Sequence, residues 1–204
     1  MIGIVDYGLG NLVSVAAAVA RLGFEATVSA EADVLWDCDK IILPGVGAFG
    51  DGMRNLEERG LVAPLTRMVK DDGKPVLGIC LGSQLISRAS DEFGLRQGLG
   101  WVDAHCQRLS PDEPGLRVPH VGWNDLIQVR DDPLFQDIPE GALFYYVHSY
   151  FVESEDSDLV VGECDYGGRI ASVLRRDNIC ATQFHPEKSQ RHGLTLLRNF
   201  LDGA

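Results

Sequence analysis

The segment Gly78-Ile79-Cys80-Leu81-Gly82-Ser83-Gln84 decides the fold prediction for this chain. It overlaps the apolar run 75–79, which is typical of a short buried strand, and it leads into a helix-like stretch over 81–88. Glycines two residues before and after Cys80 suit a sharp strand-to-helix turn, because a Cβ at either place would clash where strand and helix pass closely. The pattern is that of a nucleophile elbow with a sulfur in place of the usual serine oxygen.

Cys80 is therefore the predicted nucleophile. A helix N-terminus presents unpaired N–H groups that favour a thiolate, and the N–H of Leu81 would point to where an oxyanion forms in acyl transfer. The alternative is a buried structural cysteine, the usual fate of a free cysteine. The flanking glycines favour the nucleophile.

The composition is that of an ordinary globular protein. The chain has 204 residues, and we expect a single domain over 1–204. Apolar residues make up 45% and charged residues 24%. The formal net charge is −12 and no Lys/Arg-rich run is present, which argues against a nucleic-acid-binding surface. Solubility alone explains an acidic surface of this kind.

The cysteines and the N-terminus give information about the cellular compartment of the protein. Five cysteines are scattered along the chain without a C-x-x-C pair, which predicts neither a disulfide framework nor a zinc site. We expect no metal and no cofactor. The first six residues lack a basic leader, and the longest apolar stretch, 15–20, is far too short for a membrane span. We therefore expect a soluble cytoplasmic protein.

The first half of the chain alternates predicted strands and helices. Strands are expected at 2–5, 24–28, 40–43 and 76–79. Helices are expected from a cap at Asn11 to about Leu22, and over 51–60 and 61–71. Continuous apolar strands separated by helices indicate a parallel sheet with helices on both faces. Sites in such sheets form beyond the carboxyl ends of the strands, where Cys80 and the Pro44-Gly45 loop both lie.

The second half contains shorter strand-like pieces separated by turn residues, at 101–106, 116–121, 125–129, 142–147, 158–164 and 168–175. A last strand over 179–184 leads into a closing helix over 190–201. The predicted fold class is thus α/β: a doubly wound, mostly parallel sheet with helices on both faces and an antiparallel strand extension in the second half.

His185-Pro186-Glu187 follows the last predicted strand. Proline makes the preceding residue extended, and in extended chain residues i and i+2 project to the same side. Glu187 can then orient the imidazole of His185, as the third member of a catalytic triad does. A histidine beyond a buried strand, in a chain with a nucleophile elbow, favours function over a solvated surface role. His105, His120, His148 and His192 have weaker claims, and a packed strand and a pocket wall are equally supported for His148.

The loop Pro44-Gly45-Val46-Gly47-Ala48-Phe49-Gly50 contains a formal G-x-G-x-x-G. It is a weak dinucleotide motif, because a proline separates strand from glycines and no strand ending in an acid follows about twenty residues later. We favour a loop that turns a backbone N–H toward the target of the sulfur as a second oxyanion donor.

These motifs together resemble the class I (triad) glutamine amidotransferases. Further segments resemble, within that family, the glutaminase subunits of imidazole glycerol phosphate synthase, and the likeness runs from the first strand to the last helix. Those segments are Asp6–Asn11, Pro119–Asn124, Val147–Tyr150 and His185–Ser189. One departure is Ser83, where the family pattern has methionine.

The resemblance implies a role for each matching position. The catalytic triad would be Cys80, His185 and Glu187, and the oxyanion site would be formed by Val46, Gly47 and Leu81. The glutamine substrate would be held by a third set: Gly45, Gln84, Glu92 and the backbone of Ser149 and Tyr150. A fourth set would face a cyclase partner, a (β/α)₈ barrel: Asn11, Trp123, Tyr145 and Lys188. A solvated cation at a helix start is the alternative for Lys188.

The same resemblance implies hydrolysis of L-glutamine through a cysteinyl thioester and delivery of the ammonia to the cyclase in a heterodimer. The isolated chain is then expected to be a poor glutaminase that its partner stimulates. Three alternatives stay open: a paralogous glutaminase serving another synthase, such as one for sugar amidation; a cysteine peptidase or γ-glutamyl hydrolase; and a nucleotide-binding or regulatory module using the glycines of 45–50.

Overall fold

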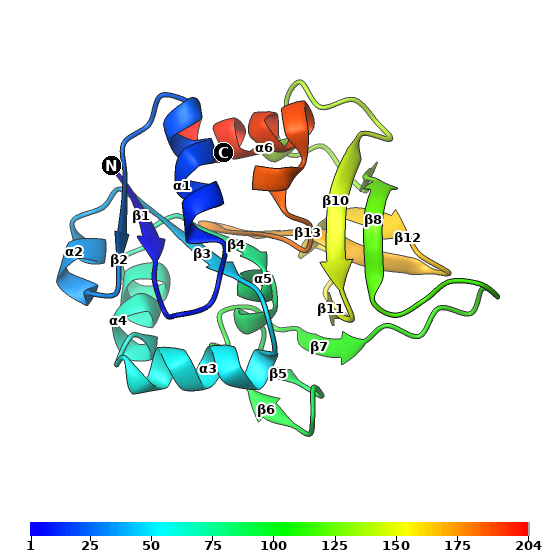
Figure 1. Cartoon of the computed structure of the whole chain (residues 1–204), viewed down its shortest axis with the longest axis horizontal. Coiled ribbons are helices and arrows are strands. Elements are labelled where there is room, and N and C mark those ends of the chain that lie inside the picture. Colours follow the sequence, from blue (N-terminus) through cyan, green and yellow to red (C-terminus); the bar gives the residue numbers. More distant parts are fainter. Residues whose placement is uncertain (204) are drawn as a thin grey trace.

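The computed structural model describes residues 1–203 and contains a central eight-stranded sheet (Figure 1). Five neighbouring strands pair in parallel: β2 (Ala26–Ser29), β1 (Ile2–Val5), β3 (Lys40–Gly45), β4 (Val76–Cys80) and β14 (Ile179–Thr182). The sheet continues beyond β14 with three antiparallel strands: β13 (Arg169–Arg176), β12 (Val160–Asp165) and β9 (Ile127–Gln128). The predicted mostly parallel sheet with an antiparallel extension is confirmed.

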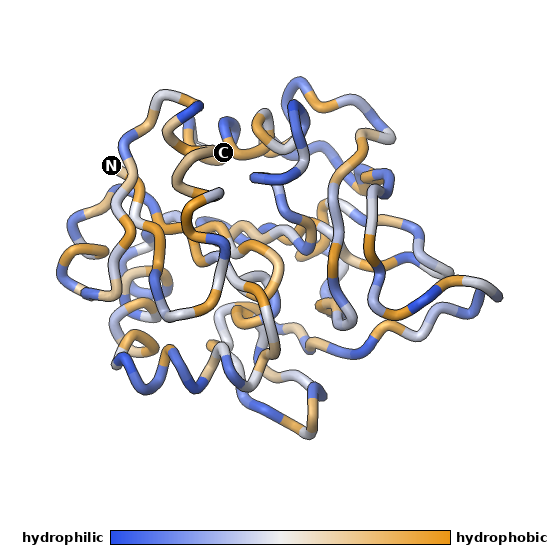
Figure 2. The backbone as a smooth tube through the Cα atoms, in the orientation of Figure 1, coloured by the Kyte–Doolittle hydropathy of each residue, from blue (hydrophilic) through white to orange (hydrophobic). Residues whose placement is uncertain are grey.

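Helices cover both faces of the sheet. Figure 1 shows α1 (Leu12–Arg21) and α6 (Gln190–Asp202) on one side. The other side carries α2 (Ala32–Trp36), α3 (Phe49–Glu58), α4 (Val62–Thr66), a π-helical turn η1 (Arg67–Asp71) and α5 (Leu81–Leu85). Alternate residues of one strand enter different cores: Ile42 packs with α1 and α6, and Ile41 with α3 and α4. Burial on both faces explains the unbroken apolar strands, which are orange in Figure 2.

Two smaller sheets stand beside the antiparallel end. One pairs β8 (His120–Asp125) with β10 (Leu143–His148). The other has the order β11 (Tyr150–Glu153), β7 (His105–Arg108), β5 (Ala89–Ser90), β6 (Arg96–Gln97). Short 3-10 turns η2 (Pro133–Phe135) and η3 (Pro186–Lys188) complete the elements. The backbone N–H of His185 donates to Tyr145 O at 3.0 Å, so β10 lies beside the carboxyl end of β14.

Several predicted boundaries are wrong. The piece predicted at 101–106 begins only at His105, and the one predicted at 116–121 starts at His120. The helix predicted over 81–88 stops at Leu85. Its end is set from outside, because Leu99 N donates to Leu85 O at 2.8 Å and Trp101 N to Ile86 O at 2.9 Å. The short elements α2, β5, β6 and β11 were not predicted.

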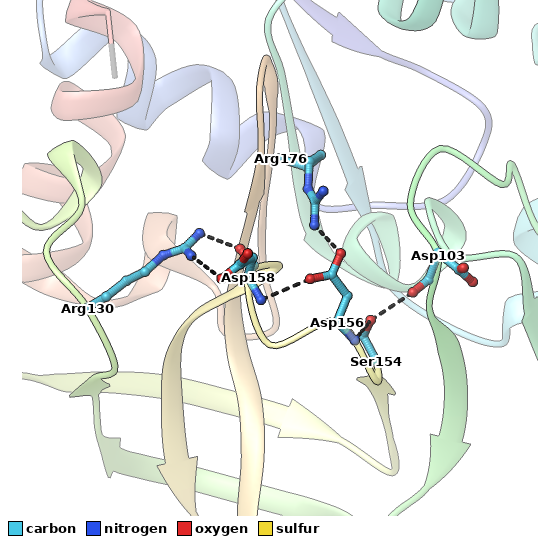
Figure 3. Close-up of polar contacts among 6 residues, drawn as sticks. All are labelled: Asp103, Arg130, Ser154, Asp156, Asp158 and Arg176. Carbon is cyan, nitrogen blue, oxygen red and sulfur yellow. Dashed lines mark hydrogen bonds and ion pairs between the residues drawn. The ribbon is translucent and has the colours of Figure 1, made fainter.

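Ion pairs hold the loop between β11 and β12. Figure 3 shows Asp156 bonded to Arg176, which ends β13, and Asp158 bonded to Arg130. The N–H of Asp158 also donates to Asp156 Oδ1 at 3.0 Å. These pairs are largely solvent-exposed, and such pairs contribute about 0–1 kcal/mol each. They fasten the loop to the sheet. Among residues 1–203, no helix is long and apolar enough to cross a membrane.

Candidate active site

Cys80 stands on the predicted elbow. It ends β4 and immediately precedes α5, with φ 55° and ψ −107°, a backbone conformation that is strained for any residue other than glycine. A Cβ on Gly82 would overlap the carbonyl oxygen of Leu43, and one on Gly78 would lie 2.8 Å from Gly82 O. The steric reason for both glycines is therefore confirmed. The strained backbone at Cys80 places its sulfur beyond the carboxyl edge of the sheet.

Ser83, the departure from the family pattern, does not line the cavity above Cys80. Its hydroxyl donates to Cys80 O at 2.6 Å and is buried. The side chain thus supports the backbone of the elbow.

His185 and Glu187 form a buried pair. His185 Nδ1 lies 2.8 Å from Glu187 Oε1, and both side chains are almost wholly buried. A carboxylate only accepts, so Nδ1 carries a proton and Nε2 is directed elsewhere. Within residues 1–203, His185 Nε2 has no hydrogen-bond partner, and His185 lines the same cavity as Cys80. Burial lowers the pKa of His185, but interactions with Cys80 and Glu187 outweigh it and raise this pKa to about 9.

One cavity of about 340 Å³ joins the two halves of the site, a size that suits a small polar ligand. Its lining residues come from β4, α5, β10 and β11, and from the segments that follow β3, β5 and β14 or precede β8. The lining residues are Val46, Gly47, Cys80, Leu81, Gln84, Glu92, Pro119, Val147, His148, Ser149, Tyr150 and His185. Parallel pairing explains part of this assembly, because Gly45 is in register with Cys80 and so brings the next residues to the cavity.

The predicted oxyanion residues border the cavity. Leu81 is the first residue of α5, directly after Cys80. Val46 is exposed, and Gly47 has φ +108° with open space around it. The loop thus lies next to the sulfur without being packed against it.

The predicted glutamine-binding residues are mostly at the cavity wall. Gln84 Nε2 donates to Tyr150 O at 2.9 Å, and Glu92 Oε2 accepts from Phe49 N at 2.6 Å. Gly45 does not line the cavity. It is packed below it, where a Cβ would overlap the Tyr7 hydroxyl. Its substrate-binding role stays a prediction.

The sequence reasoning missed Gln183 as a site residue. This buried side chain donates from Nε2 to Cys80 Sγ at 3.8 Å and accepts from Gln84 Nε2 at 3.1 Å. A signal for it was available, because the predicted strand over 179–184 places Gln183 two residues before His185, where the two-residue alternation expects the same side.

His148 is both a packed strand residue and a cavity wall, so the two readings left open by the sequence hold together. It lies 3.0 Å from His120, ring nitrogen to ring nitrogen. Burial lowers the pKa of His148 to about 3 and that of His120 to about 4. Both imidazoles are therefore neutral at neutral pH.

Three of the four predicted partner-facing residues gather on one surface. Trp123 and Tyr145 are cross-strand neighbours with ring centroids 5.9 Å apart, and Lys188 Nζ lies 6.0 Å from the Tyr145 ring centroid. Asn11 instead accepts from Ser14 N at 3.4 Å as the cap of α1. Among the residues described, no group of His, Cys, Asp or Glu has the arrangement of a metal site.

Comparison with known proteins identifies the family. The family model described as "Glutamine amidotransferase class-I" matches residues 3–204. The chain belongs to the class I glutamine amidotransferases. Within them it groups with imidazole glycerol phosphate synthase subunit HisH: 48% identity to that of Geobacter sulfurreducens (98% of this chain, 97% of that one) and 47% to that of Syntrophotalea carbinolica (99% and 100%).

Solved structures agree on the amidotransferase fold. A chain described as a glutamine amidotransferase superposes with a TM-score of 0.76 at 20% identity, covering 98% of this chain and 97% of that one. The structure titled PurLQS from Thermotoga maritima gives the same TM-score, identity and coverage. The family match and the HisH relatives indicate an enzyme with glutaminase activity, and the cavity above Cys80 is its candidate active site.

Proposed function

We propose that this chain hydrolyses L-glutamine at Cys80, with His185 and Glu187 completing the triad, and supplies the ammonia to a cyclase subunit in histidine biosynthesis. The observation that carries the proposal is a strained cysteine at the end of a parallel strand, facing one cavity with a histidine that a buried glutamate orients. That arrangement combines a nucleophile, a base and an orienting carboxylate.

The protonation state of His185 suits the first step. With a pKa of about 9, the imidazole is protonated at neutral pH and can pair with a thiolate. The thiolate attacks the carboxamide carbon of glutamine, and N–H groups of Leu81 and the Val46–Gly47 loop stabilise the oxyanion. The imidazolium then gives its proton to the departing nitrogen, which leaves as ammonia and leaves a glutamyl thioester on Cys80.

Deacylation uses the same groups in the opposite sense. The imidazole of His185 is now neutral and takes a proton from water, which attacks the thioester carbonyl. Collapse of the second oxyanion releases glutamate and restores the thiolate–imidazolium pair. Glu187 keeps Nδ1 protonated throughout, so that Nε2 alone exchanges protons with the reactants.

The partner assignment rests on the relatives' name and on one surface. HisH relatives are named as subunits of imidazole glycerol phosphate synthase, and we assign this chain a (β/α)₈ cyclase partner. The outer face of the β8–β10 sheet presents exposed Val121, Trp123 and Leu143. Exposed apolar groups on one small sheet suit a protein interface. The proposal includes a single domain over residues 1–204, a heterodimer and a cytoplasmic location.

The test combines co-purification with an ammonia assay. The chain should co-purify with its cyclase, release ammonia from free glutamine slowly alone, and do so faster in the complex with the cyclase ligand bound. Cys80→Ala should keep complex formation and abolish ammonia release. Ammonia release by Cys80→Ala, or equal turnover with and without partner, would contradict the proposal.

A paralogous glutaminase feeding another synthase is the second candidate, because the geometry of the triad is indifferent to the acceptor. Growth of a strain that lacks its own glutaminase subunit separates the two. Rescue of histidine auxotrophy by the wild-type chain, but not by Cys80→Ala, supports the histidine pathway, and failure to rescue alongside active glutaminase supports the paralogue.

A further inference from the structure

A continuous set of buried and part-buried hydrogen bonds connects Cys80 to the β8–β10 sheet. At its near end, Tyr150 O only accepts, so the Gln84 group 2.9 Å from it must be the NH₂. The same NH₂ faces Gln183 Oε1 at 3.1 Å. Gln183 is thereby forced to turn its own NH₂ toward Cys80 Sγ, 3.8 Å away.

The far end fixes its own donors and acceptors independently. Asn124 Oδ1 accepts from Asp125 N at 2.8 Å, and Asn124 Nδ2 donates to Asp165 O at 2.9 Å. The group that Asn124 presents to His120 Nε2, at 3.4 Å, is therefore a donor. His120 Nε2 must accept, which leaves the proton of this neutral ring on Nδ1.

The two ends meet at the histidine pair and agree. His120 Nδ1 lies 3.0 Å from His148 Nε2, so His148 accepts there and carries its proton on Nδ1. His148 Nδ1 lies 2.9 Å from Tyr150 O, which can only accept. Working from Asn124 and working from Tyr150 thus give the same tautomers. A second proton on either ring would place two N–H donors opposite each other.

Burial makes this arrangement rigid. The four side chains of Gln84, His120, His148 and Gln183 are all more than nine-tenths buried. The His120 ring is stacked between two tyrosines, with centroids 4.8 Å from Tyr146 and 3.9 Å from Tyr166. Buried polar groups hold one orientation when every partner is satisfied.

We propose that Gln183 is a further catalytic residue, whose amide N–H holds the Cys80 thiolate, and that His148 is a positioning residue that keeps this amide turned through Tyr150 O and Gln84. The inference rests on the proposed function in that Cys80 must be the nucleophile. The need for such a donor is visible at the sulfur, because Val147 O also lies 3.8 Å from it, on top of its interaction with His185. A carbonyl oxygen repels a thiolate, and the Gln183 N–H offsets that repulsion.

Thiol alkylation tests the role of Gln183 directly. We would measure the rate at which iodoacetamide modifies Cys80 at pH 7, located by peptide mass spectrometry. Cys80 is the most exposed cysteine, at 6%, with the other four at 1% or less. Gln183→Leu removes the donor, and Gln183→Glu keeps the size and the acceptor for Gln84 but points a carboxylate oxygen at the sulfur.

Both variants should react about tenfold or more slowly than wild type, the effect expected for one hydrogen bond to a charged group. Thr182→Val is the matched control: Thr182 is the last residue of β14, directly before Gln183, is also buried, and loses one hydrogen bond, to Phe184 O, outside the chain of contacts. It should react as wild type does. A wild-type rate in Gln183→Leu, with slowing confined to Gln183→Glu, would show repulsion only and overturn the role of the amide.

Two substitutions of His148 test its positioning role, because each keeps only one of its two hydrogen bonds. Asparagine places an N–H near the position of Nδ1 and keeps the bond to Tyr150 O, whereas glutamine places an acceptor near Nε2 and keeps the bond from His120. His148→Asn should alkylate within about twofold of wild type, and His148→Gln about threefold or more slowly. Equal rates, or the reverse order, would overturn the positioning role.

The failure of this inference and that of the proposed function are separable. Loss of ammonia release in Cys80→Ala concerns the function, whatever the alkylation ratios. If the wild-type chain is an active glutaminase and Cys80 alkylates equally fast in Gln183→Leu, the proposed function stands and the role of Gln183 is wrong.

Discussion

The two sides of the active-site cavity are built differently. On one side the elbow at Cys80 is locked, since a Cβ on Gly82 would overlap the backbone of β3 and the cysteine itself is held at positive φ. On the other side the loop at Val46 and Gly47 is exposed, and a Cβ on Gly47 would meet nothing within 4 Å. Both sides are predicted to contribute a donor to the same oxyanion.

This difference separates the groups whose positions the chain fixes by itself from a loop whose orientation can still change. The proposed nucleophile Cys80, the proposed base His185 and the Leu81 N–H are held by packing and hydrogen bonds within this chain. The loop donor has no such packing, so its orientation is open to change by a bound partner. A glutaminase built this way is restrained until the loop is set, which fits the low activity expected of the isolated chain.

The largest effect should come from the locked side. Gly82→Ala should destabilise the fold by about 4 kcal/mol or more, because the added Cβ overlaps backbone that cannot move away. Gly60→Ala, at φ +66° with open space around it, is the matched control and should cost about 1 kcal/mol. Urea unfolding measures both. Similar losses in the two variants would remove the distinction between locked and open glycines.

The second largest effect should come from the residue that orients the proposed base. Glu187→Gln should lower kcat by about a hundredfold or more while leaving the KM for glutamine within about threefold, because the glutamate orients His185 and does not line the cavity. Partner-stimulated ammonia release provides the measurement. A change confined to KM would mean that Glu187 acts on substrate binding.

A smaller effect concerns the buried neutral histidines behind the locked side. The pKa of His148 is lowered by burial from 6.5 to about 3, so its contribution to stability is full above pH 6.5 and is lost as pH falls toward 3. At pH 5 the loss should be about 2 kcal/mol relative to pH 7. Urea unfolding of wild type and His148→Asn at both pH values isolates it. An equal pH dependence in the two proteins would contradict the neutral, buried state.

The smallest effect on stability belongs to the open side. Gly47→Ala should cost about 1–2 kcal/mol of folding stability, from the strain of φ +108° alone. It should lower kcat about tenfold or more by disturbing the loop donor, and leave the alkylation rate of Cys80 unchanged. Slower alkylation in this variant would show that the loop also holds the sulfur, and the comparison of the two sides would fail.

Sequence reasoning predicted the central sheet correctly, and it selected the three proposed triad residues, because both depend on local patterns. Apolar runs mark the parallel strands, flanking glycines mark the elbow at Cys80, and a two-residue alternation places Glu187 beside His185. Elements fixed by distant partners were missed. The strand β11 is paired with β7, about forty residues earlier, and no local periodicity announces it.

The polar network behind the site was missed for a related reason. The alternation that placed Glu187 beside His185 could also have indicated Gln183, but the direction of the Gln183 amide depends on Gln84 and Tyr150, which come from other elements. The tautomers of His120 and His148 depend on Asn124 in the same way. Such donor and acceptor assignments exist only once the chain is folded.

The most direct measurement is acid quenching of the complex during turnover of L-glutamine, followed by peptide mass spectrometry, with His185→Gln included to slow deacylation. We predict a glutamyl group carried as a thioester on the peptide containing Cys80, and its absence in Cys80→Ala. Continued ammonia release without such an adduct, or an adduct on another cysteine, would contradict the account.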